Sequence, residues 1–261
     1  MKIYCLSIYP NHLENFKKMN LIPVGLGNEL FDHNWLTDKG ANFISDKNEN
    51  FGEYTFHYKL WKSKINDHDD WIGFCSYRRF WTKISNEKIS SFEDLDKIII
   101  KTTPEHWNKY DVILGNPLIF NKIKNIKLIK RNFFEILKKP SVLFKRNTLE
   151  DQFRIFHGSF FLDEAINLLS EKYQKNFKLF LSNYELYPYN MFICKNNKIL
   201  NHFYSELFPW LFSCEEKFKN SNLKGYDKKR IYGFLAERYM PFWFKTNYKT
   251  TTCPITFFEN K

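Results

Sequence analysis

Short apolar runs alternate along this chain with longer stretches in which apolar residues recur every three or four positions. The runs of strand length cover residues 3–9, 21–27, 71–75, 111–115 and 189–194. The stretches with helical spacing cover residues 50–65, 91–101, 162–181, 201–218 and 228–244. This alternation predicts an α/β fold with a parallel or mixed sheet between helices. The helical last third is expected to complete one side of a cleft.

Two helix starts have a recognisable capping signal. Asn50 is followed three residues later by Glu53, and Thr148 by Asp151, which is the spacing of a capping box. After the first of these, aromatic residues recur at helical spacing and predict one continuous buried face. Its members are Phe51, Tyr54, Tyr58 and Trp61, followed by Ile65.

The apolar run 71–75 ends abruptly in Ser76-Tyr77-Arg78-Arg79. In open α/β sheets, ligands bind outside the carboxyl ends of the strands, and this polar cluster lies at such an end. Guanidinium groups suit bidentate recognition of phosphate or carboxylate. We therefore predict an anion-binding site here, the alternative being that the arginines pair with acidic residues of the fold.

Composition describes an ordinary globular chain with a strong basic excess. Of 261 residues, 43% are hydrophobic and 26% are charged, which excludes a disordered chain. The formal net charge of +11 favours anionic partners such as nucleic acid, phosphorylated small molecules or acidic lipid. Lysines interleave with apolar residues between Lys122 and Lys145, a pattern that suits an anionic membrane surface, an acceptor cleft or a solvated face.

The cysteines and the apolar runs of the chain indicate the cellular compartment in which the protein is expected. The five cysteines are scattered within apolar runs, without metal-binding spacing, and so are expected to be buried, reduced thiols of a cytosolic protein. No signal sequence or membrane span is recognised, so a cytoplasmic location with at most peripheral contact with the inner membrane face is expected. We expect one domain over residues 1–261, made of an N-terminal half (1–120) and a helical C-terminal half (121–261).

Several blocks of the sequence resemble a bacterial family of unknown function assigned to capsule, exopolysaccharide and lipooligosaccharide biosynthesis. The segment from Asn42 to Asn48, with Glu53-Tyr54-Thr55 and Tyr58 to Lys62, resembles its N-I-S-x-K-N … E-[LY]-T … Y-x-x-W-K block. Gly73 to Arg79 resembles G-[LF]-C-H-Y-R-R, with Ser76 where many members have His. Later matches are Asn190 to Ile193, Trp210 to Phe212 with Glu215, and Arg230 to Arg238.

The resemblance implies a glycosyltransferase of GT-A-like fold, a Rossmann-related mixed sheet with a helical C-terminal part. It implies a nucleotide-sugar donor, UDP-linked and possibly UDP-galactofuranose, and a growing bacterial surface glycan or lipid-linked saccharide as acceptor. On this resemblance, residues 1–120 are expected to form the nucleotide-sugar-binding half and residues 121–261 the acceptor-side half. Transfer is expected to proceed with inversion. The rival interpretations are a non-catalytic glycan-binding or assembly protein and a basic nucleic-acid binder. The second is disfavoured because the aromatics fall at buried helical spacing, so no nucleic-acid partner is expected.

GT-A enzymes usually neutralise the leaving diphosphate with a divalent metal on a D-x-D motif. Asp67-His68-Asp69 precedes its strand, and Asp94-Leu95-Asp96 falls within a helical pattern, so no residue is assigned to a metal. Metal dependence is therefore left open, and Arg78 or Arg79 is expected to supply the charge instead. One of these arginines pairing with Glu53 or Glu237 is the alternative.

Inversion needs a base for the acceptor hydroxyl, and we assign Asp151, His157 and Glu185 as catalytic candidates. Capping explains Asp151 equally well, and a lone histidine is commonly structural. The predicted donor-binding residues are Asn42, Asn48, Glu53, Tyr54, Ser76, Tyr77, Arg78 and Arg79. Core packing competes for Tyr54. Asn190, Glu237 and Arg238 are further cleft candidates, the last two being expected to point one to the cleft and one to solvent.

Overall fold

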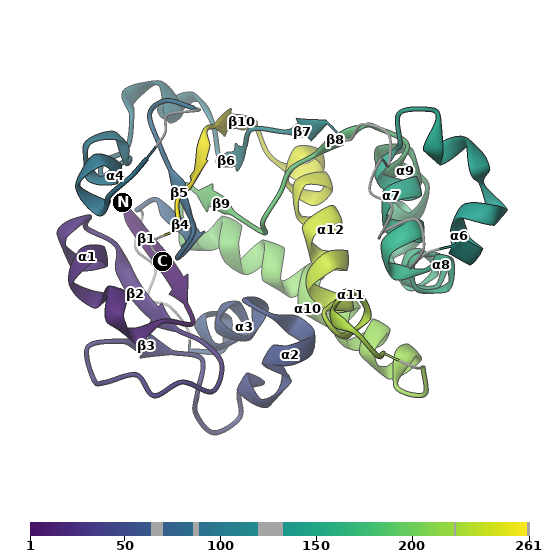
Figure 1. The fold of residues 1–261 in the computed structure, drawn as a ribbon, viewed down its shortest axis with the longest axis horizontal. Coiled ribbons are helices and arrows are strands. Elements are labelled where there is room, and N and C mark those ends of the chain that lie inside the picture. The colour runs from purple at the N-terminus through teal and green to yellow at the C-terminus, as the bar shows by residue number, and fades with distance from the viewer. Residues whose placement is uncertain (64–69, 86–88, 120–132, 222, 260–261) are drawn as a thin grey trace.

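A computed structural model describes residues 1–63, 70–85, 89–119, 133–221 and 223–259, and a mixed β-sheet forms its centre (Figure 1). The strands are β1 (Lys2–Ser7), β2 (Ile22–Gly25), β3 (Leu36–Thr37), β4 (Ile72–Ser76), β5 (Arg79–Trp81), β6 (Val112–Gly115), β7 (Leu118–Ile119), β8 (Glu185–Leu186), β9 (Phe192–Cys194), β10 (Thr250–Cys253) and β11 (Ile255–Phe257). The main sheet runs in the order β10-β6-β9-β4-β1-β2-β3. Neighbours are parallel except β9, which is antiparallel to both β4 and β6.

Three further antiparallel pairings complete the strands. β5 folds back from the end of β4 and also pairs with β11, while β7 and β8 form a separate two-stranded sheet. The mixed sheet confirms the predicted fold class, because parallel strands here alternate with helices along the chain.

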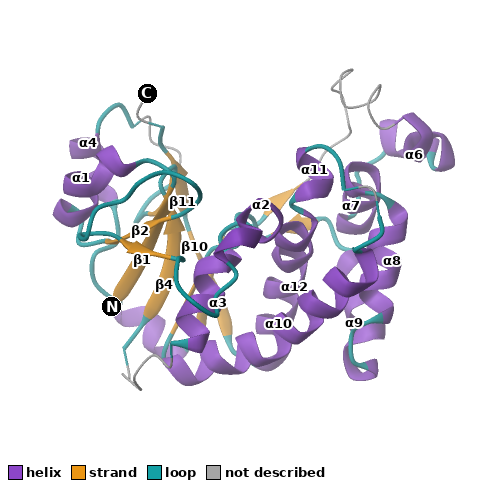
Figure 2. Ribbon diagram, turned by 90° about the horizontal axis from the view of Figure 1, so that it is seen from below, coloured by secondary structure: helices purple, strands orange, loops and turns teal. Residues whose placement is uncertain are grey.

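Helices cover both faces of the sheet (Figure 2). They are α1 (Leu13–Lys18), α2 (Asn48–Phe51), α3 (Tyr54–Lys62), α4 (Phe92–Ile98), α6 (Phe133–Lys138), α7 (Leu149–His157), α8 (Ser159–Asn167), α9 (Glu171–Leu181), α10 (Asn197–Phe218), α11 (Tyr226–Lys229) and α12 (Ile231–Asn247), with 3-10 turns η1 (Pro10–His12), η2 (Ser45–Lys47), η3 (Glu105–Lys109) and η4 (Pro140–Leu143). α1 and α4 lie on one side, and α3, α10 and α12 on the other. α6 to α9 gather away from β1–β3 in both views.

The alternation of side chains along β1 divides the core into two parts. Tyr4 and Leu6 join the apolar cluster beneath α3, α10 and α12, whereas Ile3 and Cys5 join the cluster beneath α1 and α4. Successive residues of a strand point to opposite faces, so a strand buried on both sides is apolar throughout. All five cysteines are buried and free, as the sequence predicts.

The predicted helix boundaries hold in some places and fail in others. The Thr148–Asp151 capping box is present at the start of α7. The capping box predicted at Asn50 and Glu53 is wrong. Gly52, with φ 59°, ends α2 and separates it from α3. The single helix predicted over 162–181 is also wrong, since the non-helical backbone of Ser170 separates α8 from α9.

Other boundaries move by a few residues. β9 starts only at Phe192, because Tyr189 and Asn190 have left-handed backbones. The helix predicted from 228 is divided into α11 and α12, and the one predicted to 101 ends at Ile98. Ile65, Asp67, His68 and Asp69 lie outside the described residues, as does the first part of the Lys122–Lys145 stretch. Within the described ranges, no helix is long and apolar enough to cross a bilayer.

Candidate functional site

A cleft of about 850 Å³ opens at the carboxyl ends of β1 and β4. One wall comes from Ser7 at the end of β1, the following Ile8 and the β4–β5 turn, and the other from α2 and the α11–α12 segment. This is the edge of a parallel sheet at which α/β proteins bind ligands. Eight of the predicted residues line the cleft: Asn48, Glu53, Ser76, Tyr77, Arg78, Arg79, Asn190 and Glu237.

The β4–β5 turn presents the two arginines. Ser76 and Arg79 pair across the turn, and the backbone N–H of Tyr77 donates to the Leu6 carbonyl at 3.0 Å, which ties the turn to β1. Arg78 pairs with the Glu259 carboxylate at 3.0 Å, and its guanidinium lies 4.9 Å from the centre of the Tyr77 ring. The charge of Arg78 is therefore partly neutralised by the end of the chain that follows β11.

Arg79 has aromatic neighbours instead of an acidic one. Its guanidinium lies 4.0 Å from the centre of the Tyr189 ring and 5.5 Å from that of Phe257. No carboxylate of the described residues forms an ion pair with it, and its Nε has no hydrogen-bond partner there. The Ser76 hydroxyl beside it also lacks such a partner. Arg79 thus brings an unneutralised positive charge to the cleft, held in place by cation–π contacts.

The opposite wall carries a chain of hydrogen bonds that ends in a carboxylate. Tyr54 donates from its hydroxyl to Asn190 Oδ1 at 3.1 Å, and Asn190 Nδ2 donates to Glu53 Oε1 at 2.9 Å. The second oxygen, Glu53 Oε2, accepts from Arg230 at 3.3 Å. Tyr54 itself is fully buried and contributes through Asn190, not by lining the cleft.

Both carboxylate oxygens of Glu237 already accept hydrogen bonds. The Tyr189 backbone N–H donates to its Oε1 at 2.7 Å, and Arg238 donates to its Oε2. Arg238 is 2% exposed and also bonds to Gln152, and burial lowers its pKa while Glu237 opposes that shift. The expectation that one of this adjacent pair faces solvent is therefore wrong, because Arg238 points into the interior.

The pairing of a β4–β5 turn arginine with Glu53 or Glu237 is wrong, whereas the pairing of one of them with an acidic residue of the fold holds for Arg78. Glu53 pairs with Arg230 and Glu237 with Arg238, while Arg78 takes Glu259. Sequence reasoning did not assign Arg230 to the site, although it lies in the lining. The available signal was the R-x-x-G-F-L-A-E-R block, which begins at that arginine.

Besides Tyr54 and Arg238, four predicted site residues lie away from the lining. Asp151 caps α7 and pairs with Lys139, and buried His157 bonds through Nδ1 to the Asp227 carbonyl at 2.8 Å and stacks on Phe234. Glu185, on β8, accepts from the Tyr187 hydroxyl at 3.0 Å. Asn42 is exposed with φ 68°. Asn48 does line the cleft, but its amide donates to Gly52 and Thr55 and so holds the α2–α3 turn.

The described residues do not offer a metal centre. No group of three His, Cys, Asp or Glu side chains in the described ranges converges as metal ligands would. Asp94 on α4 accepts from Ser90, Ser91 and Lys97, and Asp96 pairs with Lys101 at 2.6 Å. These aspartates therefore act as helix-end and surface groups, as the sequence pattern predicts.

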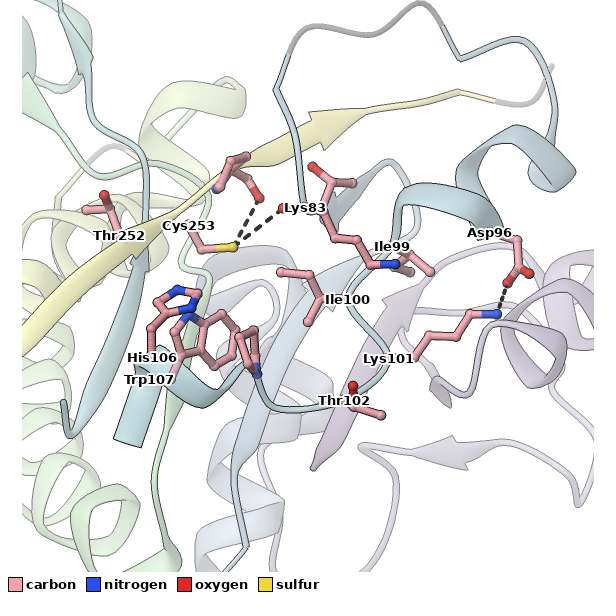
Figure 3. Close-up of a pocket in the computed structure, with 13 residues that line it drawn as sticks. Lys83, Asp96, Ile99, Ile100, Lys101, Thr102, His106, Trp107, Thr252 and Cys253 are labelled. Atoms are coloured by element: carbon pink, nitrogen blue, oxygen red, sulfur yellow. Dashed lines mark hydrogen bonds and ion pairs between the residues drawn. The ribbon is translucent and has the colours of Figure 1, made fainter. Parts of the chain in front are cut away.

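A second hollow of about 570 Å³ lies between α4, η3 and the end of β10 (Figure 3). Ile99, Ile100 and Trp107 form its apolar lining, and the ammonium of Lys101 is paired with Asp96. Its carboxylate, Asp96, is thus already paired, while Lys83 and His106 also line the hollow.

Three comparisons with known proteins bear on this geometry. The sequence profile of a family described as "Domain of unknown function (DUF4422)" matches residues 2–248. A solved structure of the bifunctional glycosyltransferase WbbM in its apo form is similar with a TM-score of 0.73 and 20% sequence identity. The similarity covers 100% of this chain and 45% of that one. No curated protein matches the chain. The fold described above is thus that of a glycosyltransferase structure, of which this chain spans less than half.

Proposed function

The chain belongs to the DUF4422 family, and from that premise we propose that it is a glycosyltransferase acting on a nucleotide sugar. The acceptor is a hydroxyl of a growing bacterial surface glycan, of a capsule, exopolysaccharide or lipooligosaccharide. We propose a UDP-linked donor, and UDP-galactofuranose is the first to test. The observation that carries this proposal is the unpaired Arg79 guanidinium in the cleft at the carboxyl end of β4.

Arg79 suits the charge that develops on the leaving group. As the bond between the anomeric carbon and the diphosphate oxygen breaks, negative charge accumulates on the diphosphate, and a fixed cation stabilises it. A guanidinium can donate two parallel hydrogen bonds to phosphate oxygens. Arg78 contributes once the diphosphate displaces Glu259, with which it is paired at 3.0 Å. A metal ion is not needed in this scheme, and the described residues of the cleft do not converge as ligands for one.

Glu53 is the carboxylate best arranged to act as the base. In an inverting transfer, the acceptor oxygen attacks the anomeric carbon and gives its proton to the base as the donor bond breaks. Asn190 fixes one oxygen of Glu53, whereas the contact of the other with Arg230 is long, at 3.3 Å. Both oxygens of Glu237 already accept hydrogen bonds, from Tyr189 and Arg238.

A donor panel tests the function. The protein is incubated with UDP-, GDP-, CMP- and dTDP-sugars, including UDP-galactofuranose, with and without glycan acceptor and with and without EDTA, and nucleotide release is measured. Turnover of one donor that survives EDTA supports both the transferase and the role of the arginines. EDTA-sensitive turnover keeps the transferase and overturns the metal-free scheme. If no donor releases nucleotide when acceptor is present, the result favours a glycan-binding or assembly protein instead.

Replacing Glu53 tests the assignment of the base. Glu53→Gln retains an oxygen for Asn190 but cannot take up the proton, so turnover should fall by about 10²–10⁴-fold while the affinity for UDP changes little. Glu49→Gln is the matched control, because Glu49 also lines the cleft but is largely exposed and pairs with Lys229. Equal turnover of the Glu53→Gln variant and the unmodified protein would contradict the assignment.

A further inference from the structure

The surface formed by α6 and the end of η4 exposes large apolar side chains. Phe133, Phe134 and Leu137 on α6 are 51%, 78% and 56% exposed, and Phe144 after η4 is 72% exposed. The α6 and η4 elements contact each other, so these side chains belong to one end of the molecule. We call these four residues the α6–η4 surface. Exposed aromatic side chains gathered at one place mark an interaction site more often than single ones do.

The exposure is not a failure of α6 to pack. Ile136 on the same helix is 4% exposed and joins Val142 and Ile155 in a small buried cluster. At 100° per residue, Phe133, Phe134 and Leu137 fall within one arc of the helix, and Ile136 falls outside it. Lys139 also anchors the segment by pairing with Asp151 of α7. The helix therefore buries one side and presents an aromatic side outward.

Positive charge accompanies the aromatic side. Lys139, Lys145 and Arg146 are exposed within a few residues of it. The sequence from 133 to 146 contains four Lys or Arg residues and a single acidic residue, Glu135. An anionic surface is the electrostatic complement of such a segment.

We propose that the α6–η4 surface docks on an anionic lipid bilayer, with its aromatic side chains in the boundary between headgroups and acyl chains. The neighbouring Lys and Arg side chains then contact lipid phosphates, as in interfacial amphipathic helices. Two other occupants fit the surface less well. Protein interface cores are depleted of lysine, and a second copy of this chain would bring the same positive charge against it. This inference does not depend on the proposed transferase activity.

Vesicle binding tests the proposal without donor or acceptor. The full chain is sedimented with vesicles of equal parts phosphatidylglycerol and phosphatidylcholine, and separately with phosphatidylcholine alone. We expect binding to the anionic vesicles, weakened about tenfold or more in the double variant Phe134→Glu/Phe144→Glu. Leu30→Glu and Leu179→Glu are matched controls, because both leucines are highly exposed elsewhere on the molecule, at 88% and 69%. These controls should bind like the unmodified chain.

Three results would overturn the proposal. The first is no binding to anionic vesicles, and the second is binding that the double variant retains in full. The third is a dimer, measured by light scattering, that the double variant converts to a monomer, because the surface would then join two copies. A further variant, Lys145→Glu/Arg146→Glu, should reduce binding to anionic vesicles and leave the thermal unfolding midpoint unchanged, since both side chains are exposed.

Discussion

Arg78 and Arg79 are neighbours in sequence, yet their charges are neutralised differently. Arg78 reaches Glu259, whereas Arg79 contacts the rings of Tyr189 and Phe257. Arg78 lies in the turn and Arg79 is the first residue of β5, and their guanidiniums meet different surroundings. An ion-paired arginine contributes less to anion binding than a free one, because the anion must first displace its partner.

We therefore expect Arg79→Ala to weaken UDP binding by about 10- to 100-fold, the loss of one or two charge-assisted hydrogen bonds. Isothermal titration calorimetry measures the change. Arg78→Ala should weaken UDP binding less. In the unmodified protein the diphosphate must displace Glu259 from Arg78, so the variant loses this cost together with the contact to phosphate. Arg154→Ala is the control, since that arginine pairs with Glu150 and Asp163 and does not line the cleft. Equal affinities in Arg79→Ala and Arg154→Ala would exclude a phosphate-binding role for Arg79.

His57 is a buried titratable residue with a measurable effect on stability. It is fully buried, its Nδ1 lies 2.7 Å from the Tyr204 hydroxyl, and its ring centre lies 4.0 Å from that of Phe74. Burial lowers the pKa of His57 from 6.5 to about 3. The unfolded chain thus takes up a proton in a range of pH in which the folded chain cannot, so stability is lost as the pH falls from 6.5 towards 3.

Between about pH 7 and about pH 5, this difference should cost about 2 kcal/mol of unfolding free energy. Urea unfolding at the two pH values measures it. His57→Phe retains an aromatic ring but cannot titrate, so its stability should depend less on pH by about the same amount. An identical pH dependence in the two proteins would show that His57 is protonated in the folded state.

At the scale of elements, the break between α2 and α3 positions the proposed base. Gly52 has φ 59° and ψ −134°, a conformation that side-chain-bearing residues rarely adopt. A Cβ at this position would collide with the Arg230 guanidinium. Glu53 follows directly after this break and reaches Asn190 and Arg230.

Gly52→Ala should accordingly destabilise the fold by about 1–3 kcal/mol from backbone strain, with additional loss of turnover because Arg230 is displaced from Glu53. Gly225→Ala is the matched control, because Gly225 also has a positive φ, 81°, but a Cβ there would meet open space. Urea unfolding and turnover are measured for both. If the two variants lose equal amounts of stability and turnover, the collision with Arg230 adds nothing to the effect of backbone strain.

At the scale of the molecule, the last strands link the sheet to the site. The family profile ends at residue 248, but β10 pairs with β6 and β11 pairs with β5 beyond that point. Cys253 and Phe258 are each 4% exposed, so this segment belongs to the core. It also supplies Phe257 and Glu259, which contact the two arginines.

A chain ending at Tyr248 should therefore lose cooperative unfolding, or unfold at a markedly lower temperature, and lose UDP binding. Removing β10 and β11 exposes apolar surface and leaves β5 and β6 with unpaired edges. Differential scanning calorimetry measures the transition. Glu259→Gln is the control, because the half-exposed ion pair with Arg78 is worth about 1 kcal/mol or less. This variant should keep its midpoint and bind UDP slightly more tightly.

The sequence by itself determined the features that depend on short-range patterns. The first, second, fourth and sixth strands, the capping box at Thr148 and the burial of the cysteines follow from local periodicity and capping chemistry. The same reasoning identified the arginine turn after β4, because the carboxyl end of a buried strand is a fixed place in an α/β sheet.

Only the tertiary structure decided which charges meet. Glu53 and Arg230 are 177 residues apart, and Arg78 and Glu259 are 181 residues apart, so no local pattern specifies either pair. Asp151 and His157 have suitable chemistry for a base, but the packing of α7 directs them to a cap and to the Asp227 carbonyl. Residue type states what a side chain can do, whereas the order of the strands and the breaks between helices determine what it faces.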